Sequence, residues 1–500
     1  MRRSFVVAVF ALALSTPAAA QSTPHEKLAR EVYKELIEIN TVDSVGSVTK
    51  AVEALAARFK AAGFPAEDIH VLIPPNAPTK GNLVVRYHGR GGANAPKPIL
   101  LLAHLDVVAA LRADWPRDPF ILNEENGFFL GRGTSDDKSM ASIFATNLLW
   151  MKQEGVVPDR DIILALTADE EGGGSNGARW LATEHKDLID AEYAINEGGD
   201  GALVNGKPVT NGVMAAEKVS VNFTFTALNS GGHSSMPRPD NAIYELSKAL
   251  LKVGEFEFPV VLNPVTTAYL TQSSKAQPNK EFAAAEMAIV ANPTDAKANA
   301  ILAKDSFVHS ILRTTCVATR LAGGHANNAL PQTATANVNC RVEPTSSYEY
   351  VLATLQRVVG DTGVRITMQG GSRLTGVVGA PPSAVPADFL SAVTTITRKM
   401  WGDIPVVPQM STGATDGKYL REAGIPTFGV SGLFYEGEER NMHGRDEKIR
   451  VKSYYDGLAF LDQLVRALAV KTKMLGERPT SDVNYQTPTV SRDISTMVCT

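Results

Sequence analysis

The residues most suited to chemistry form a run of three acids, Asp169-Glu170-Glu171, followed by Gly172-Gly173-Gly174. The run comes directly after the apolar stretch 162–166, which we interpret as a buried strand. A loop at the end of such a strand usually emerges over the crevice of an α/β sheet, and adjacent carboxylates there repel each other unless a cation holds them. The stretch therefore favours a metal site, with a simple acidic turn as the alternative.

A second candidate pair, His104 and Asp106, directly follows the apolar stretch 98–103. Residues two apart at the end of a strand face the same way, so Asp106 can reach the ring of His104. A carboxylate in that place fixes the tautomer of a metal-bound imidazole. The alternative is a core histidine whose hydrogen bond the aspartate satisfies.

Three further candidates lie elsewhere in the chain. Asp136-Asp137 follows a glycine-rich turn and precedes a helical stretch, where helix capping is the competing explanation. Glu197 follows a short apolar stretch, and His443 lies in a polar loop far along the chain. In an open sheet, the strand ends that carry these acids and His104 converge on one crevice. Carboxylates and imidazoles without thiolates suit Zn²⁺, Mn²⁺ or Co²⁺.

The elements that must position these residues alternate between strands and helices. Strand-like patterns occupy 81–88, 98–103, 162–168 and 193–196, and helical spacing occupies 26–39, 47–63, 139–153 and 176–184. This alternation predicts an α/β domain with a mostly parallel sheet and helices on both faces.

The pattern changes near residue 216. Strand-like alternation over 219–227, 313–321 and 333–342, with helical spacing over 241–253 and 347–359, predicts a smaller α+β domain. Helical spacing over 387–400 then returns to the earlier style. We therefore predict that one α/β domain, built from 21–215 and 373–500, is interrupted by a second domain over 216–372.

The composition excludes several kinds of partner. The chain has 500 residues, of which 44% are hydrophobic and 20% charged, and its formal net charge is −4. That is enough for two or more domains, and no basic block suggests nucleic acid or an anionic membrane. Residues 1–20 join Arg2-Arg3, a short apolar stretch and Ala18-Ala19-Ala20, the pattern of a cleaved signal peptide. We expect an exported protein, periplasmic or secreted, with no membrane attachment after cleavage.

Only three cysteines are present, Cys316, Cys340 and Cys499, too few for a disulfide framework or a thiolate metal site. Cys316 and Cys340 lie on two strand-like stretches that flank a turn. They either pair across the strands in an oxidising compartment or remain buried free thiols, and the sequence leaves both open.

Taken together, six motifs resemble the M20 family of co-catalytic metallopeptidases, which includes carboxypeptidases, aminoacylases and dipeptidases. The enlarged stretch 254–308 resembles the carboxypeptidase S and N-acyl amino acid hydrolase branch. The motifs occur in the family's order over about residues 30–460: His104-x-Asp106, Gly131-x-Gly133-x-x-Asp136-Asp137-Lys138, Asp169-Glu170-Glu171-Gly172, Asn196-Glu197-Gly198, Gly231-Gly232-His233-Ser234-Ser235-x-Pro237 and His443-Gly444.

The resemblance implies a catalytic domain with two divalent metal ions, Zn²⁺ before Mn²⁺ or Co²⁺. Five residues would bind them: His104 and Glu197 one ion, Glu171 and His443 the other, and Asp136 both. Asp106 would orient His104, and Glu170, beside a ligand, would be the general base.

The implied reaction is hydrolysis of an amide. Two metals lower the pKa of the water that they share, Glu170 takes its proton, and the resulting hydroxide attacks the carbonyl. Glu170 then returns the proton to the leaving nitrogen. In the family, the histidine that corresponds to His233 stabilises the oxyanion, often from the partner subunit of a homodimer formed through the lid domain, here 216–372.

The resemblance also implies contacts with the substrate. Asn328 and Arg341 match substrate-binding positions, and Arg341 would hold a free carboxylate. Thr412-Gly413-Ala414-Thr415-Asp416 matches a glycine-rich substrate loop, although Ser411 or Thr412 stands where the family has its first glycine. Gly413 and Thr415 are the expected contacts. The substrate would be a peptide cut by a carboxypeptidase, with an N-acyl amino acid or a dipeptide as the alternative.

Two other classes of protein compete with this hypothesis. Gly173-Gly174-Ser175-Asn176-Gly177 fits the G-x-S-x-G pattern of serine hydrolases, but the acid run occupies the tight turn that such a nucleophile needs. A binding protein without catalysis would be expected to lack the base or a ligand, and all are present. Inhibition by a chelator and loss of turnover in Glu170→Gln distinguish a metallohydrolase from both.

Overall fold

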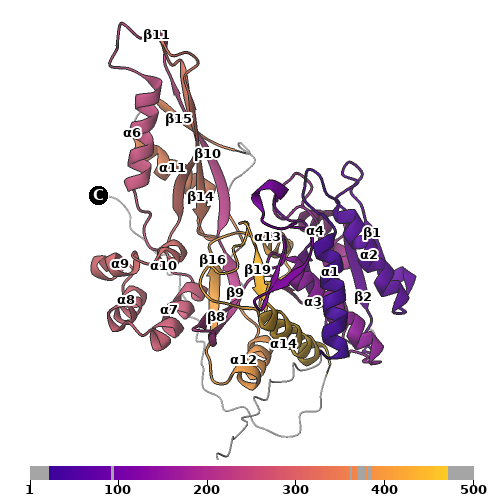
Figure 1. Ribbon diagram of the computed structural model, residues 1–500. Helices are drawn as coiled ribbons and strands as arrows, with labels where there is room; N and C mark the ends of the chain where they lie inside the picture. The colour runs from indigo at the N-terminus through magenta and orange to yellow at the C-terminus, as the bar shows by residue number, and fades with distance from the viewer. Residues whose placement is uncertain are drawn as a thin grey trace, which may run out of the picture.

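The computed structural model describes residues 22–91, 95–360, 363–369, 376, 378–380, 382 and 384–470. The expected signal peptide, 1–20, lies outside the described residues. A rounded body carries a narrow projecting arm (Figure 1). Within the described part of the chain, no helix has the length and apolarity that crossing a bilayer requires.

A ten-stranded sheet forms the centre of the body, in the order β1-β2-β6-β3-β7-β17-β9-β8-β18, with β16 paired to β9. The neighbours β6, β3, β7 and β17 run parallel, which confirms the predicted mostly parallel sheet in its central part. The strands are β1 (Ile69–Leu72), β2 (Asn82–Tyr87), β3 (Ile99–His104), β6 (Ile162–Thr167), β7 (Tyr193–Asn196), β8 (Gly201–Val204), β9 (Lys207–Glu217), β16 (Val406–Ser411), β17 (Thr427–Gly429) and β18 (Phe434–Tyr435).

Helices cover both faces of this sheet, as predicted. On β3, Leu101 and Ala103 belong to one apolar cluster, whereas Leu100 and Leu102 belong to another, because successive side chains point to opposite faces. A strand buried on both sides needs apolar residues at every position, and β3 has them up to His104. The first face is covered by α1 (Pro24–Glu38), α2 (Val48–Ala61), α3 (Lys138–Gln153), α12 (Ala387–Trp401) and α14 (Val451–Ala469), and the second by α4 (Gly177–Glu184), α5 (Lys186–Ile189) and α13 (Gly417–Glu422).

The arm is a four-stranded antiparallel sheet, in the order β12-β14-β10-β15, with two helices on one face. It has its own core, in which Phe223, Val338 and Leu355 are buried. A two-stranded pair, β11 and β13, lies at its far end (Figure 1). The elements are β10 (Val219–Leu228), β11 (Gly232–His233), α6 (Ala242–Glu255), β12 (Thr315–Gly323), β13 (Ala329–Leu330), β14 (Thr333–Val342), α11 (Tyr348–Val359) and β15 (Val364–Met368).

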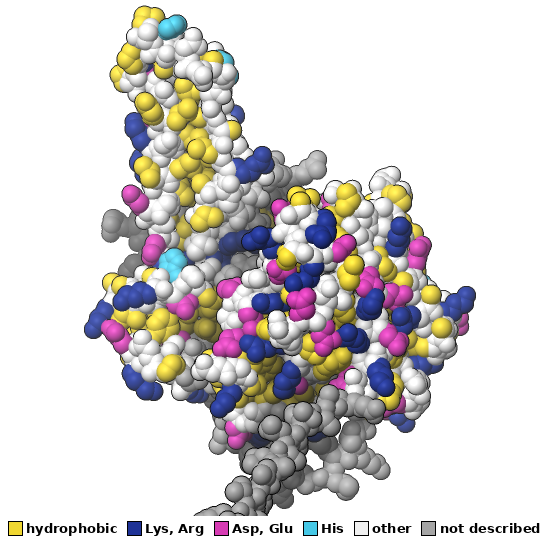
Figure 2. All heavy atoms as spheres, viewed as in Figure 1, with side chains coloured by type: hydrophobic (Ala, Val, Ile, Leu, Met, Phe, Trp, Pro, Cys, Tyr) yellow, Lys and Arg dark blue, Asp and Glu magenta, His cyan; other side chains and the backbone are white. Residues whose placement is uncertain are grey.

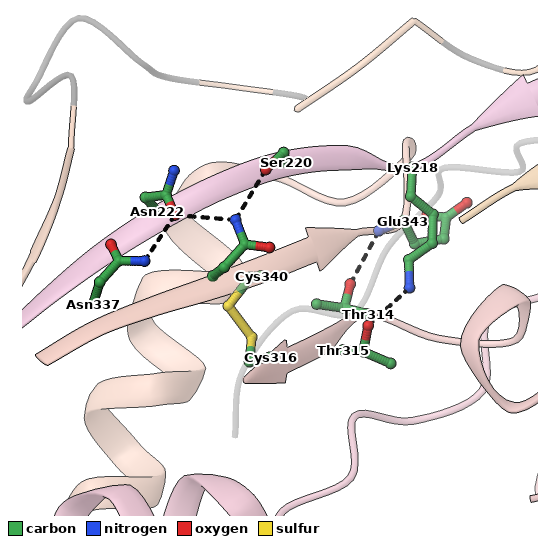
Figure 3. The surroundings of a disulfide bond; sticks show 10 residues. Lys218, Ser220, Asn222, Thr314, Thr315, Cys316, Asn337, Cys340 and Glu343 are labelled. Atoms are coloured by element: carbon green, nitrogen blue, oxygen red, sulfur yellow. Dashed lines mark hydrogen bonds between the residues drawn. A yellow bond between two sulfur atoms is a disulfide. The ribbon is translucent and has the colours of Figure 1, made fainter. Parts of the chain in front are cut away.

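Cys316 of β12 and Cys340 of β14 form a disulfide, the first of the two alternatives that the sequence left open. The two residues are direct partners across the strands. Figure 3 shows the bridge joining β12 to β14 on the side of the sheet away from Ser220 and Asn222. The bridge therefore holds the outer strand of the arm to the strand that carries Arg341.

Four helices depart from the predicted domain boundaries. They fall within 216–372, yet their buried residues, such as Leu270, Ile289 and Leu302, belong to the apolar cluster of the body. The apolar spacing of a helix predicts a buried face but not the surface against which that face packs, and β16, from the C-terminal part of the chain, supplies this surface to α7. The helices are α7 (Pro264–Ala276), α8 (Lys280–Ala291), α9 (Ala296–Leu302) and α10 (Ser306–Ile311).

Candidate metal centre

Three adjacent parallel strands carry most of the candidate ligands to one edge of the sheet. His104 ends β3, Glu170 and Glu171 follow β6, and Glu197 follows β7. Because the carboxyl ends of neighbouring parallel strands open onto the same crevice, these side chains meet although the strands are far apart in sequence.

Asp136, on the loop before α3, lies at the centre of the group. Its Oδ1 is 3.1 Å from His104 Nε2, and its Oδ2 is 3.0 Å from His443 Nε2. His443 Nε2 is also 2.9 Å from Glu171 Oε1, and His104 Nε2 is 3.9 Å from Glu197 Oε1. One carboxylate thus faces two histidines, each of which has a second carboxylate beside it. Two sets have ligand atoms within 4.8 Å of one another: His104, Asp136 and Glu171; and His104, Asp137 and Glu197.

The chemistry of these donors fits divalent cations. Burial raises the pKa of the Glu197 carboxyl well above its usual range, against the effect of His104, and the nearby charge of Asp137 raises it further. Asp137 Oδ2 is buried without a hydrogen-bond partner. Buried acids that repel one another and an acceptor oxygen without a donor are both satisfied by positive charge. Imidazole and carboxylate ligands without thiolate suit Zn²⁺, Mn²⁺ or Co²⁺.

Glu170 lines the same cavity as the proposed ligands Asp136, Glu171, Glu197 and His443. Burial raises the pKa of its carboxyl to about 8; His104 lowers it, and the negative charges of Asp416 and Glu171 raise it. A carboxylate that lines the cavity beside the proposed ligands, without being one of them, is placed to take up and release a proton during turnover.

Asp106 contacts His104 through a different atom from the one expected. His104 Nδ1 is 3.0 Å from the backbone oxygen of Asp106 and 3.6 Å from its Oδ1. The carboxylate instead accepts hydrogen bonds from the backbone amides of Glu170 and Glu171, at 3.1 and 3.0 Å. The backbone of Asp106 therefore orients the imidazole, and its side chain fixes the acid turn.

The centre opens into a cavity of about 860 Å³. Arg341, at the end of β14, and Phe307, from α10, line it together with Glu170 and His443. The cavity thus includes residues from the body, from the arm and from the inserted helices.

Gly413 and Thr415 also line the cavity. The backbone amide and Oγ1 of Thr415 both donate to Glu217 Oε2 at 2.8 Å. Glu217 also forms a buried ion pair with Arg421, so it holds the loop of Thr415 in a fixed position. Glu217 was not predicted as a site residue, although it ends β9 just as the other acids end or follow their strands.

His233 and Asn328 do not reach the cavity of their own chain. They lie in or beside the β11–β13 pair, and β11 is at the far end of the arm (Figure 1). His233 is opposite Ala329 across this pair. The backbone amide of Ser234 donates to the backbone oxygen of Asn328 at 3.0 Å, and His233 and Asn328 are exposed. Within one chain, these two residues are neighbours of each other and not of the metal centre.

A comparison with protein families matches residues 100–467 to peptidase family M20/M25/M40. The human N-fatty-acyl-amino acid synthase/hydrolase PM20D1 is 26% identical over 386 residues, covering 75% of this chain and 75% of the relative. The probable carboxypeptidase S-like 2 of Dictyostelium discoideum is 26% identical over 397 residues, covering 77% and 74%.

Solved structures show the same fold. The M20 family metallo-carboxypeptidase Sso-CP2 from Sulfolobus solfataricus aligns with a TM-score of 0.65 and 18% identity, covering 88% of this chain and 98% of that one. A dinuclear metal binding peptidase of the M20 family from Bacillus subtilis, YXEP, aligns with a TM-score of 0.54 and 12% identity, covering 89% and 98%.

Proposed function

Because this chain belongs to peptidase family M20/M25/M40, we propose that it is an exported, metal-dependent hydrolase that cleaves the amide bond next to a C-terminal amino acid. The observation that carries the proposal is the position of Arg341 in the same cavity as the metal centre. A carboxylate bound at Arg341 would place the preceding amide between that residue and Glu170.

Arg341 is the free cation of the cavity among the described residues. Arg440 also lines the cavity, but its Nη1 donates to Asp200 at 2.7 Å, and Lys418 forms an ion pair with Glu422 at 2.7 Å. A guanidinium without an ion pair offers a fork of donors that matches a carboxylate. In a cavity whose other end is acidic, a substrate carboxylate is attracted to Arg341 and repelled elsewhere.

The residues of the chain have separate roles in the proposed hydrolysis. Two divalent cations, which we propose to be Zn²⁺ held by His104, Glu197, Asp136, Glu171 and His443, would polarise the amide carbonyl and lower the pKa of a bound water molecule. Glu170 accepts the proton of the attacking water and passes it to the leaving nitrogen. Asp106 keeps Glu170 in place through the backbone of the acid turn.

We also propose a homodimer formed through the arm. β12 is an edge strand, and its Val317 and Leu321 are 59% and 68% exposed. Tyr244 and Leu251 of α6 are 61% and 66% exposed, and Figure 2 shows hydrophobic side chains gathered along the arm. An unpaired strand edge beside exposed apolar residues suits pairing with a second copy. Such a partner would supply His233 to the cavity of the first chain.

Export is supported by two features. The signal-peptide pattern of residues 1–20 directs a chain out of the cytoplasm. The disulfide between Cys316 and Cys340 is typical of proteins that fold in an oxidising compartment. We therefore propose that the mature protein works in the periplasm or outside the cell.

An N-acyl amino acid is the second candidate substrate. Two exposed apolar side chains line the cavity, Phe307 at 39% and Met442 at 43% exposure, and they would contact an acyl chain. The relative PM20D1 is named as a hydrolase of such compounds.

Three substrates that share one leaving amino acid test the proposal: a peptide with a free C-terminus, the same peptide amidated, and an N-acyl amino acid. With Zn²⁺ added, we expect the free peptide to be cut and a chelator to stop the reaction. The amidated peptide should be cut at least about tenfold more slowly, because it lacks the charge that binds Arg341. Equal rates for the two peptides would contradict the proposal, and a preference for the N-acyl compound would favour the second candidate.

A further inference from the structure

A buried ion pair, Arg132 with Glu447, joins the two loops that carry Asp136 and His443. Arg132 Nη1 donates to Glu447 Oε2 at 2.6 Å, and the side chains are only 3% and 1% exposed. Neither residue is among the described residues that line the cavity. The pair therefore lies next to the proposed metal ligands but outside the lining of the cavity.

Glu447 holds the loop of the bridging aspartate through its backbone. Glu447 Oε1 accepts hydrogen bonds from the backbone amides of Ser135 and Asp136, at 2.8 and 3.1 Å, and from Ser135 Oγ at 3.1 Å. Its Oε2 accepts the backbone amide of Gly133 at 3.2 Å in addition to Arg132. With these donors, both oxygens of one carboxylate fix the conformation of the loop up to Asp136 itself.

Arg132 holds the loop of His443 in the same way. Arg132 Nη2 donates to the backbone oxygens of His443 and Gly444, at 3.3 and 3.1 Å. It also lies 3.5 Å from the backbone oxygen of Ala109, in the loop after His104 and Asp106. The guanidinium thus connects segments that the sequence separates by 311 residues.

A buried ion pair is weak evidence for stability, because removing two charges from water costs free energy that apolar residues would not require. Here the pair contacts the backbone of two proposed metal ligands, Asp136 and His443, whose side chains lie 3.0 Å from each other. We infer that Arg132 and Glu447 are positioning residues, which set the spacing of Asp136 and His443 and so the affinity of the centre for divalent metal. This inference rests on the metal centre of the proposed function.

The test compares two buried Arg–Glu pairs in the full chain. Glu447→Gln keeps the size of the side chain but presents an amide to donors that need an acceptor, so we expect the Kd for Zn²⁺, measured by competition with a chromophoric chelator, to rise about 10- to 100-fold. Glu217→Gln is the matched control, because its pair with Arg421 is equally buried but anchors Thr415. We expect Glu217→Gln to raise KM and to leave the Kd for Zn²⁺ within about twofold.

The visible spectrum of the Co²⁺-loaded protein gives a second readout, since it reports ligand geometry. It should change in Glu447→Gln and not in Glu217→Gln. An unchanged Kd for Zn²⁺ in Glu447→Gln would overturn the inference, and so would equal losses in both variants, which would indicate general destabilisation. If Glu447→Gln does not fold, Glu447→Asp and Arg132→Lys, which keep both charges but shift the contacts, are expected to weaken Zn²⁺ binding in the same direction.

These outcomes are separable from those of the proposed function, because metal affinity is measured without substrate. Suppose that the wild-type protein binds Zn²⁺ but cleaves no amide, and that Glu447→Gln has a lower affinity for Zn²⁺. That result would contradict the proposed reaction and leave the positioning role intact. If instead the wild-type protein cleaves the free peptide and Glu447→Gln has an unchanged Kd for Zn²⁺, the proposed reaction would be supported and the positioning role contradicted.

Discussion

Asp136 Oδ2 and His443 Nε2 lie 3.0 Å apart, although 307 residues separate them in the sequence. A small antiparallel sheet brings their loops together: β19 (Lys448–Arg450) pairs with β5 (Phe128–Leu130), so that Lys448 is opposite Leu130. The acid turn reaches the same point, with Glu171 Oε1 2.9 Å from His443 Nε2. Three distant segments therefore build one centre.

Glu170→Gln should lower kcat about 10²- to 10⁴-fold, because the amide cannot accept the proton of the attacking water. Its affinity for Zn²⁺ should change little, since Glu170 is not a proposed ligand. Steady-state kinetics and metal analysis of the purified variant check both expectations. Glu184→Gln, at the exposed end of α4, is the control and should match wild type. A variant that keeps normal turnover would assign the base to another residue.

Arg341→Met should raise KM for a peptide with a free C-terminus about 10- to 100-fold, the scale of lost hydrogen bonds to a charged group. The amidated peptide should be affected far less, because it offers no carboxylate. Arg365→Met, exposed on the same sheet of the arm, serves as the control. Equal effects on both peptides would show that Arg341 does not recognise the C-terminal charge.

The metal-free protein should lose stability as the pH rises from about 5 to about 7. Burial raises the pKa of Glu170 to about 8, and hydrogen bonds with Asp136 and Glu171 raise the pKa of His443 to about 10. Both shifts mean that the folded protein binds more protons than the unfolded chain in this window, so its free energy of unfolding falls with rising pH.

Above about pH 7 the free energy of unfolding has opposing contributions. Burial lowers the pKa of Lys138 and Lys218 to about 7, so these two groups favour the folded protein as the pH rises. Thermal unfolding after chelator treatment, with and without added Zn²⁺, measures the effect. The loaded protein should show a smaller fall in Tm, since cations replace the protons. A metal-free Tm that rises over the lower window would contradict the arrangement of buried acids around the histidines.

His233→Ala should lower kcat, and mixing it with Glu170→Gln should restore activity if His233 acts across a dimer. In a mixed dimer, the chain with intact Glu170 receives His233 from its partner. Random exchange of subunits would restore about one quarter of wild-type activity. Activity that stays at the level of the separate variants, in a preparation shown to exchange subunits, would contradict a role of His233 in trans.

The elements that carry His104, the acid run and Glu197 were predictable, because each follows an apolar strand whose length and flanking residues are distinctive. Parallel packing then determines that their ends meet. His443 could not be placed in this way: it lies in a loop without periodicity, and only its resemblance to a family motif singled it out. Arg132 and Glu447 could not be placed from the sequence either, because their roles depend on the pairing of β5 with β19.

Other differences have physical causes as well. The enlarged stretch 254–308 was evident from the sequence, but the surface against which its helix α7 packs belongs to β16, in the C-terminal part of the chain. The helix α14 is missing from the predictions, although Tyr454, Leu458 and Leu461 have the spacing of a buried helical face. Asp106 could be placed beside His104, but which of its oxygens would face the ring depended on the backbone of the acid turn.

The most direct test of the central claim is an anomalous difference map from crystals of the Zn²⁺-loaded protein. The account predicts two peaks about 3.5–4 Å apart, with one oxygen of Asp136 bound to each. His104 and Glu197 should complete one site, and Glu171 and His443 the other. A single peak, or two peaks that do not share Asp136, would contradict it.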